Sequence, residues 1–287
     1  GVSRSDIRTL AETADGVIWA GSGDGGLYRI ESNHVESFRA KDSLAGQPIW
    51  SLHVDPDGTV WAGTFRGGLL RWREGKFTRY TTQHGLPDDV ITQILDDGQG
   101  WLWLGSQSGI FRVEKAELRA FAERRRRAVN CTAYGRYDGL PSLECSGSYQ
   151  PAAWRTKDGR LLFATLKGVV SVYPAELSIN QLPPPVVIEK VLLDGRPLAP
   201  ERPLTAARLR AQPVVVEVPP GKRQIEVRYT ALSFVSPDRV RFRYQLEDLD
   251  GDWVEAGTRR FVQYPFLGPG HYRFRVKACN NDGVWNE

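Results

Sequence analysis

The stretch from Gly58 to Trp72 reads GTVWAGTFRGGLLRW, and it recurs along the chain with few changes. The other copies read GVIWAGSGDGGLYRI from Gly16 to Ile30, GWLWLGSQSGIFRV from Gly100 to Val113 and, more weakly, GRLLFATLKGVVSV from Gly159 to Val172. Trp19, Trp61 and Trp103 recur at intervals of 42 residues, and Phe163 is expected at their position in the fourth copy. A period near 40 residues is typical of the four-stranded blades of a β-propeller.

Each copy reads as short antiparallel strands separated by turns. An alternating run precedes an Asp-Gly pair, an aromatic-rich run follows it, and a second glycine turn leads into a third strand. We expect two-residue turns at four places: Asp15-Gly16, Asp57-Gly58, Asp97-Gly98 and Asp158-Gly159. The repeated tryptophan is expected to wedge between blades, and Gly21, Gly63 and Gly105 to let neighbouring backbones approach.

A proline-rich segment, NQLPPPVVIEKV from Asn180 to Val191, ends the repeats. Its three consecutive prolines predict a stiff hinge. Six or seven strand-like runs follow with no helical pattern, and alternation is clean in RFRYQL and YRFRVKA. We therefore expect an all-β protein. Residues 1–180 would form about four propeller blades, and residues 181–287 an immunoglobulin-like or fibronectin III-like β-sandwich.

Two stretches of the repeat region resemble a known family. HGLPDDVITQILDDGQGWLWLGSQSGIFRV is similar to a two-component regulator propeller repeat, and YDGLPSLECSGSYQPAAWRTKDGRLLFATLKGVVSVYPAEL resembles the last repeat of such an array. The resemblance covers about residues 6–180. Such arrays usually form seven-bladed propellers, so it implies that the four repeats are part of a larger propeller.

The second domain resembles the Y_Y_Y domain that follows regulator propellers. The family tyrosines map to Tyr244, Tyr264 and Tyr272, and Trp253 and Trp285 also fit. The resemblance implies the periplasmic sensor region of an inner-membrane hybrid histidine kinase or diguanylate cyclase. Such a region binds an external ligand, often an oligosaccharide. It would dimerise through the Y_Y_Y domain and relay the signal to a cytoplasmic kinase or cyclase.

Composition gives no support for a nucleic-acid or membrane-spanning function. The net charge is +4, with 38 basic against 34 acidic residues, and no apolar run approaches the roughly 18 residues of a membrane span. The arginine run Arg124–Arg127 fits either an anion-binding patch or a solvated loop. Aromatic residues do not interleave with it, as a base-stacking platform would need.

The cysteines and histidines suggest neither a metal site nor a cofactor. No CxxC pair occurs, and Cys131 and Cys145 could form either a disulfide or two buried thiols. The four histidines fall at unrelated repeat positions, and no hydrolase or zinc-protease motif is present. We therefore expect no catalysis in this chain. Two other functions stay open: a secreted or periplasmic scaffold that binds proteins, and a propeller lyase similar to streptogramin lyases.

A ligand would bind where loops gather at one end of the blades. These are the loops between second and third strands and the segments between blades. The residues that we expect to line this face are Asp24, Arg66, Gln107, Lys167, Gln47 and Asp88. Their mixed polarity suits a sugar or an anionic polymer, although each could equally be an exposed turn residue.

Overall fold

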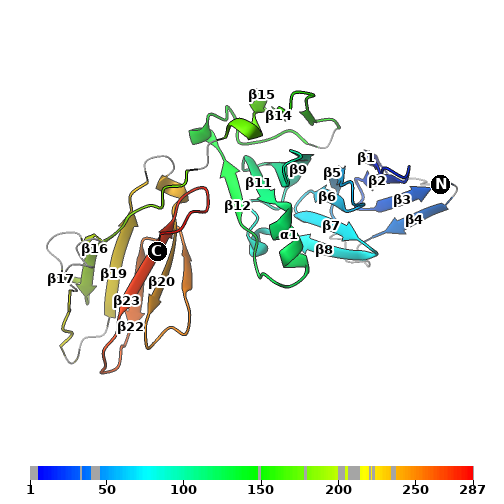
Figure 1. Ribbon diagram of the computed structural model, residues 1–287. Helices are drawn as coiled ribbons and strands as arrows, with labels where there is room; N and C mark the ends of the chain where they lie inside the picture. Colours follow the sequence, from blue (N-terminus) through cyan, green and yellow to red (C-terminus); the bar gives the residue numbers. More distant parts are fainter. Residues whose placement is uncertain are drawn as a thin grey trace. The chain divides into compact units, whose positions relative to one another are not determined.

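The computed structural model divides the chain into two compact units, Gly1–Leu177 and Ser178–Glu287, which Figure 1 shows. The structure describes residues 6–32, 34–39, 46–147, 150–177, 180–199, 204–205, 214–219, 221, 224–233 and 237–286. Strands dominate both units, so the predicted all-β class is confirmed. No helix in this described part is long and apolar enough to cross a membrane.

The first unit consists of antiparallel sheets in which each strand pairs with its neighbour in the sequence, as in propeller blades. Blade 1 contains β1 (Ile7–Glu12), β2 (Ile18–Ser22), β3 (Leu27–Glu31) and β4 (His34–Phe38). Blade 2 contains β5 (Ile49–Val54), β6 (Val60–Thr64), β7 (Leu69–Arg73) and β8 (Lys76–Tyr80), and blade 3 contains β9 (Ile91–Asp96), β10 (Trp101–Ser106), β11 (Ile110–Glu114) and β12 (Cys131–Tyr134). Blade 4 contains β13 (Ala153–Arg155), β14 (Leu161–Thr165) and β15 (Gly168–Val172).

Helical segments occur only in the connections between these strands among the described residues. The α-helix α1 (Lys115–Ala122) joins β11 to β12, and its Leu118 is fully buried in the core between blades 2 and 3. The arginine run that follows α1 is exposed, and Arg125 and Arg126 form ion pairs with Glu123 and Glu117. The short 3-10 helices are η2 (Thr82–His84), η3 (Arg136–Asp138), η4 (Pro174–Glu176) and, in the second unit, η5 (Pro237–Arg239).

The turns between the first and second strands contain three residues, so the predicted two-residue turns are wrong. In blade 1 the Thr13 N–H donates to the Val17 carbonyl, which encloses residues 14–16. Equivalent bonds run from Asp55 to Thr59, from Asp97 to Trp101 and from Thr156 to Arg160. Gly16, Gly58, Gly100 and Gly159 end these loops at φ of 82°, 78°, 98° and 87°. Such three-residue loops place glycine in the left-handed region at their last residue. In blade 3 that last residue is Gly100, and Gly98 at the first residue of the loop also has a positive φ, of 77°.

The repeated Trp-x-Gly pattern is explained by how successive blades pack. Trp19, Trp61 and Trp103 are at most 1% exposed, and each packs in a core shared with the following blade. A Cβ on Gly21 would lie 2.5 Å from Ile49 Cγ2, and one on Gly63 would lie 2.7 Å from Ile91 Cγ2. Glycine is therefore needed because the next blade's innermost strand occupies this space.

Cys145 takes the place of those isoleucines in blade 4. A Cβ on Gly105 would lie 3.3 Å from Cys145 Cβ, and Cys145 is 2% exposed. Cys131 lies in β12 opposite Val113, and both cysteines are free thiols. Of the two alternatives for this pair, the structure has free thiols. Burial raises the pKa of Cys145 to about 11.

The register of blade 4 corrects the expected alignment. Leu162 pairs with Ser171 as Trp103 pairs with Arg112, and Thr165 bonds the Gly168 carbonyl as Ser106 bonds that of Gly109. Leu162, not Phe163, therefore lies at the tryptophan position. Phe163 faces the other way, is fully buried and packs in one core with Trp103 of blade 3.

The second unit consists of two antiparallel sheets that share one core, as expected for a β-sandwich. One sheet has the order β17 (Arg196–Ala199), β16 (Val186–Leu193), β19 (Gln224–Ala231), β22 (Phe261–Pro265), with β18 (Leu204–Thr205) also paired to β16; the other has the order β21 (Val254–Gly257), β20 (Arg241–Leu246), β23 (Phe274–Cys279). Tyr244 and Tyr264 are buried between the sheets, with ring centroids 6.2 Å apart. Tyr272 is half-buried, and its hydroxyl donates to the Gly268 carbonyl.

Residues near the end of the second unit hold the segment with which this unit begins. Asn280 Nδ2 donates to the carbonyls of Asn180 and Leu182 at 2.6 and 3.0 Å, and the Asn180 N–H donates to Asp282. Asn280 is 1% exposed, so these bonds are shielded from water. The beginning and the end of the second unit are thereby fixed to each other.

Candidate functional site

The six residues expected to bind a ligand lie in loops at one end of the blades. Asp24, Arg66, Gln107 and Lys167 occupy the equivalent connections β2–β3, β6–β7, β10–β11 and β14–β15. Gln47 and Asp88 precede the inner strands β5 and β9. Side-chain hydrogen bonds and ion pairs do not join any two of these six residues. The fold thus places them on corresponding loops without forming a preassembled cluster.

Two of the six have local partners that hold them in their own blade. Asp24 forms an ion pair with Arg39 at 3.0 Å, and Arg39 also donates to the Tyr28 hydroxyl. The Ser22 hydroxyl, followed by Arg39, lowers the pKa of Asp24. Asp88 accepts the Val90 N–H at 2.9 Å, which is the turn role that its position suggests. Neither carboxylate is therefore free of an intramolecular bond.

Arg66 belongs to a stack of three side chains that we call the aromatic stack: Arg66, Phe65 and Trp50. The Arg66 guanidinium lies 4.9 Å from the Phe65 ring centroid, and the Phe65 ring lies 4.7 Å from that of Trp50 at an interplanar angle of 28°. Arg66 has φ of +71°, an uncommon conformation for a residue with a side chain. The exposed guanidinium at the end of this stack can pack on a planar or ring-shaped ligand and attract an anionic group.

Trp50 lies at an irregularity of the innermost strand. The pairing of β5 with β6 skips from Ile49 to Ser51, so Trp50 is the bulged residue. The segment before β13 covers it, since a Cβ on Gly147 would lie 2.7 Å from Trp50 Cε3 and 2.9 Å from Thr92 Cβ. Trp50 Nε1, Thr92 Oγ1 and Gln93 Nε2 are buried without a hydrogen-bond partner. Buried polar atoms of this kind usually bond water or a ligand.

Phe65 and Trp50 are not among the six residues expected from the sequence, although the sequence contains a signal for both. Their equivalents 42 residues away are Gly23 and Gln107 for Phe65, and Arg8 and Thr92 for Trp50. Aromatic residues therefore interrupt the repeat at two positions of blade 2 only. A loop residue that differs from its equivalents in the other repeats is better evidence of a binding role than a residue that all repeats share.

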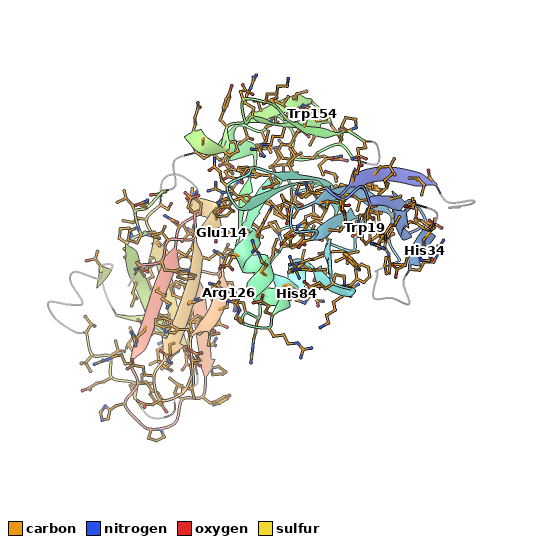
Figure 2. The ribbon with its side chains drawn as sticks, turned by 45° about the vertical axis from the view of Figure 1, so that its right-hand side comes forward. Trp19, His34, His84, Glu114, Arg126 and Trp154 are labelled. Atoms are coloured by element: carbon orange, nitrogen blue, oxygen red, sulfur yellow. The ribbon has the colours of Figure 1, made fainter. Side chains whose placement is uncertain are left out.

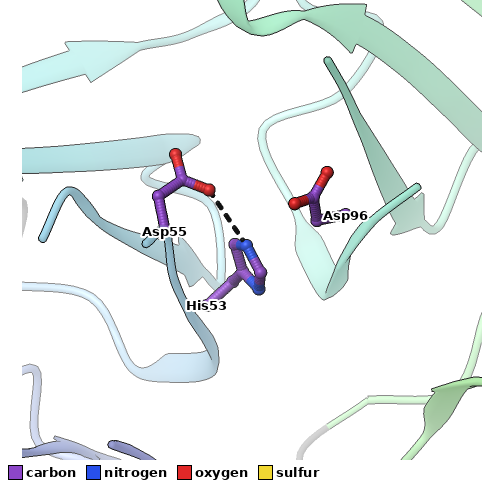
Figure 3. A group of neighbouring side chains, drawn as sticks. All are labelled: His53, Asp55 and Asp96. Carbon is purple, nitrogen blue, oxygen red and sulfur yellow. Dashed lines mark hydrogen bonds and ion pairs between the residues drawn. The ribbon is translucent and has the colours of Figure 1, made fainter. Parts of the chain in front are cut away.

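A second polar group lies at the opposite ends of blades 2 and 3, where Figure 3 shows His53, Asp55 and Asp96. Asp55 is 8% exposed; it contacts His53 Nε2 at 3.1 Å and accepts the indole N–H of Trp61 at 2.8 Å. Lys115 Nζ, at the start of α1, lies 2.5 Å from Asp55 and 3.0 Å from Asp96. Strands of two blades and a helix therefore meet in one ion-pair network.

The charges of this network stabilise one another. Burial opposes ionisation of Asp55, but hydrogen bonds from His53, Lys115 and Trp61 and the lysine charge hold its pKa well below the usual range. Burial likewise opposes the charge of Lys115, and its bonds to Asp55 and Asp96 outweigh that effect and raise its pKa. The ligand atoms of His53, Asp55 and Asp96 lie within 4.8 Å of one another. A metal ion would have to displace the lysine ammonium, so we assign the network to ion pairing between blades.

The four histidines lie at separate places in the fold. His34 lies in β4, His53 in the ion-pair network, His84 in η2 and His271 beyond β22. His84 Nδ1 accepts the Thr81 N–H, and its ring packs on Phe121. Of the hydrogen bonds and ring contacts in the described part of the chain, none joins two histidines.

Comparisons with known proteins agree with this architecture. The two-component regulator propeller family matches residues 43–66 and 85–108, and the Y_Y_Y domain family matches residues 233–287. A curated relative, histidine kinase P4 of Formosa agariphila, is 25% identical over 161 residues, which cover 55% of this chain and 11% of that protein. The chain therefore spans about a tenth of the length of this relative.

A solved structure has the same fold along the chain. It is described as the extracellular domain of a hybrid two-component system from B. thetaiotaomicron; it is 20% identical, with a TM-score of 0.67, and the match covers 100% of this chain and 38% of that one. A virginiamycin B lyase from Staphylococcus aureus is 12% identical at a TM-score of 0.44, covering 100% and 85%, which is too weak to support an argument. The chain thus carries two-component regulator propeller repeats followed by a Y_Y_Y domain.

Proposed function

We propose that this chain is part of the extracytoplasmic sensor region of a membrane-bound signalling protein of the two-component type. The observation that carries the proposal is the order of its parts: regulator propeller repeats precede a Y_Y_Y domain in one chain. The fold of a two-component extracellular domain and the sequence of a histidine kinase support it. The longer protein would be anchored in the inner membrane, this region would lie in the periplasm, and a kinase or cyclase would lie elsewhere in the sequence.

We place the proposed ligand at the loop end of the blades, on the aromatic stack. The exposed Arg66 guanidinium, which the Phe65 ring supports from below, suits an oligosaccharide, since an arginine can bond hydroxyl or acidic groups of a sugar. Lys167, Gln107 and Gln47 have no side-chain hydrogen bond or ion pair within the described residues, and could complete such a site. Asp24 and Asp88 would join only by changing their present bonds.

Signal relay would follow from a shift between two arrangements of a dimer formed through the second unit. A ligand changes such an equilibrium only by its different affinity for the two arrangements. Asn280 bonds Asn180 and Leu182, and the Leu232 N–H donates to the Pro185 carbonyl, so the sandwich holds the chain on both sides of the three prolines. The hinge expected at Pro183–Pro185 is therefore wrong, and the sandwich would move as a rigid body about a point before Asn180.

The four blades would belong to a larger propeller, because both terminal blades expose faces that the inner blades bury. Leu10 of blade 1 is 56% exposed, whereas its equivalents Leu52 and Ile94 are 6% and 5% exposed. Val169 of blade 4 is 68% exposed, whereas the equivalent Ile110 is fully buried. Trp154, which Figure 2 labels on blade 4, is also 61% exposed. These faces suit further blades of the same kind; a protein-binding scaffold would use them for a partner.

Thermal unfolding of the whole extracytoplasmic region against a panel of oligosaccharides, polyanions and small metabolites tests the proposal. A ligand at 100 times its dissociation constant should stabilise the protein by about 2.7 kcal/mol, which raises the melting temperature by several degrees. Phe65→Ala should abolish the shift, whereas Phe77→Ala, which removes a ring from a core contact in the same blade, should lower the melting temperature and leave the shift intact. If no compound shifts the folded wild type, the scaffold function gains support.

A further inference from the structure

The outer face of the three-stranded sheet in the second unit is strongly cationic. In β20 the side chains of Phe242, Tyr244 and Leu246 point into the core, so Arg241 and Arg243 point outward. Arg275 and Lys277 of β23 lie on the same face, because Lys277 pairs with Arg243 and Arg275 pairs with Gln245. We call this surface the cationic face; its residues are Arg241, Arg243, Arg275, Lys277, Glu255, Trp253 and Trp285.

Two cations on this face lie directly opposite each other across the strands. Arg243 and Lys277 are cross-strand partners, an arrangement that like charges normally destabilise. Lys277 makes no ion pair within the described residues; its ammonium lies 4.2 Å from the Trp253 ring and 5.9 Å from that of Trp285. The Arg243 guanidinium lies 4.4 Å from Trp285. The indoles offset the repulsion by cation–π attraction and hold the charges in fixed positions.

The face has more cations than carboxylates to balance them. Glu255 bonds Arg243 at 2.7 Å, and Glu247, at the edge of the face, bonds Arg275 at 3.1 Å. Within the described residues, the Arg241 guanidinium forms no ion pair, and its side-chain hydrogen bond goes to the sulfur of Cys279. On the outer face of the other sheet, by contrast, Arg228 is paired with Glu226, and Gln263 bonds the same glutamate. The named cations therefore exceed the named carboxylates by more on this face than on the other, where Lys190 and Arg228 accompany Glu226.

We propose that the cationic face binds a linear polysaccharide that carries sulfate or carboxylate groups. Neighbouring strands lie about 4.8 Å apart and alternate residues of one strand about 6.6 Å apart, so the cations form a regular grid. Guanidinium groups bind sulfate and carboxylate oxygens in pairs. A chain with acidic groups repeated along it can contact several of these cations at once. This site is separate from the ligand site proposed on the propeller loops, so either can fail without the other.

Other partners fit the face less well. Nucleic-acid bases need open aromatic rings to stack on, whereas Trp253 and Trp285 each have a cation over the ring. A second copy would present the same positive charge to itself. Among the described residues, the strongly exposed apolar side chains of this unit lie off the cationic face, and one of them, Leu249, lies in a loop with four acidic residues. Insertion into an anionic lipid surface therefore lacks an apolar anchor here.

A matched pair of double variants tests the proposal in the full chain, with heparin as the probe. Arg243→Gln with Lys277→Gln removes two cross-strand cations from the cationic face. Arg228→Gln with Lys190→Gln removes two cross-strand cations from the other sheet, with the same change in net charge. A cation near an anionic surface contributes about fivefold in affinity, so the first variant should weaken heparin binding by roughly tenfold or more. The second should change it less than twofold, and neutral dextran should not bind. Equal losses in the two variants would overturn the proposal.

A measurement on the wild type keeps the test decisive if the first variant fails to fold. Heparin should slow acetylation of Lys277 and leave that of Lys190 unchanged. If both lysines are protected alike, or neither is, the cationic face is not the site. Vesicles of phosphatidylglycerol and phosphatidylcholine form the other arm. Binding to these vesicles through Arg243 and Lys277, without heparin binding, would contradict the polysaccharide and identify a lipid surface as the partner.

Discussion

Lys115 Nζ lies 2.5 Å from Asp55 Oδ1, although the two residues are 60 positions apart and belong to different blades. Both side chains are about nine-tenths buried, and Asp96 completes the pairing of the lysine. The first residue of α1 thus joins the carboxylates of blades 2 and 3. Breaking a buried pair from one side leaves an uncompensated charge. This contact is therefore the place where a single substitution should weaken the joint between two blades most.

Lys115→Met should destabilise the first unit by about 3 kcal/mol, because Asp55 and Asp96 would remain buried without their cation. Chemical denaturation measures this loss. The matched control is Arg126→Gln, which removes the exposed partner of Glu117 and should cost less than about 1 kcal/mol. Equal losses for the two variants would mean that the buried network contributes no more than a surface ion pair.

The same network predicts how stability depends on pH. The pKa of Asp55 is lower in the folded state than in the unfolded chain, so its contribution is complete above the unfolded value of about 3.9. It is lost as the pH falls through the folded pKa. The free energy of unfolding of the wild type should therefore approach that of Asp55→Asn as the pH is lowered from 6 to 2. A difference that stays constant over this range would contradict the assignment.

The glycine of the Trp-x-Gly pattern should not tolerate alanine. A Cβ on Gly63 would lie 2.3 Å from Ser51 Oγ and 2.9 Å from the Ile91 carbonyl oxygen, which is backbone and cannot rotate away. Gly63→Ala should cost about 1–3 kcal/mol, as overpacked cores do. Gly251→Ala is the control, because a Cβ there meets nothing within 4 Å. Thermal unfolding of both variants decides whether the close approach of blades explains the pattern.

The tyrosines of the second unit should differ in importance. Tyr264 is buried and its hydroxyl lies 3.1 Å from the Asp250 carboxylate, whereas the Tyr272 hydroxyl makes a longer bond to a carbonyl near the surface. Tyr264→Phe should lower the free energy of unfolding by about 1.5–3 kcal/mol, the range for a hydrogen bond to a charged group. Tyr272→Phe should cost less than about 1 kcal/mol. Denaturant titration of the two variants gives the comparison, and a reversed order would contradict it.

The sequence predicted the fold because the blades are built from a local, repeated pattern. A strand, a turn and a second strand lie within about 20 residues, so the period of 42 and the turn glycines were enough to predict propeller sheets. The turn length was wrong because an Asp-Gly pair can also end a three-residue loop, as it does at Gly16, Gly58 and Gly159. A dipeptide signal cannot distinguish two loops that differ by where the flanking strands begin to pair.

The sites were harder to predict because their residues are distant in sequence. Lys115 meets Asp55 only through the packing of α1 against two blades, and Trp50 meets Phe65 only because a bulge turns it toward the loop end. The six residues expected to bind a ligand were chosen from loop positions alone, and the structure leaves them apart. Among the six, Arg66 has the strongest structural support for a binding role, since it extends the aromatic stack.

Thiol chemistry should distinguish the cysteines by burial. Cys145 and Cys279 are at most 2% exposed, and burial raises the pKa of both thiols. Cys131 is partly exposed at the start of β12. Because the thiolate is the reactive form, a thiol reagent at pH 8 should label one cysteine in the native protein and all three after denaturation. Cys131→Ser should abolish native labelling, whereas Cys145→Ser should leave it unchanged. Native protein that reacts only after reduction would show that Cys131 and Cys145 are joined, contrary to the free thiols observed here.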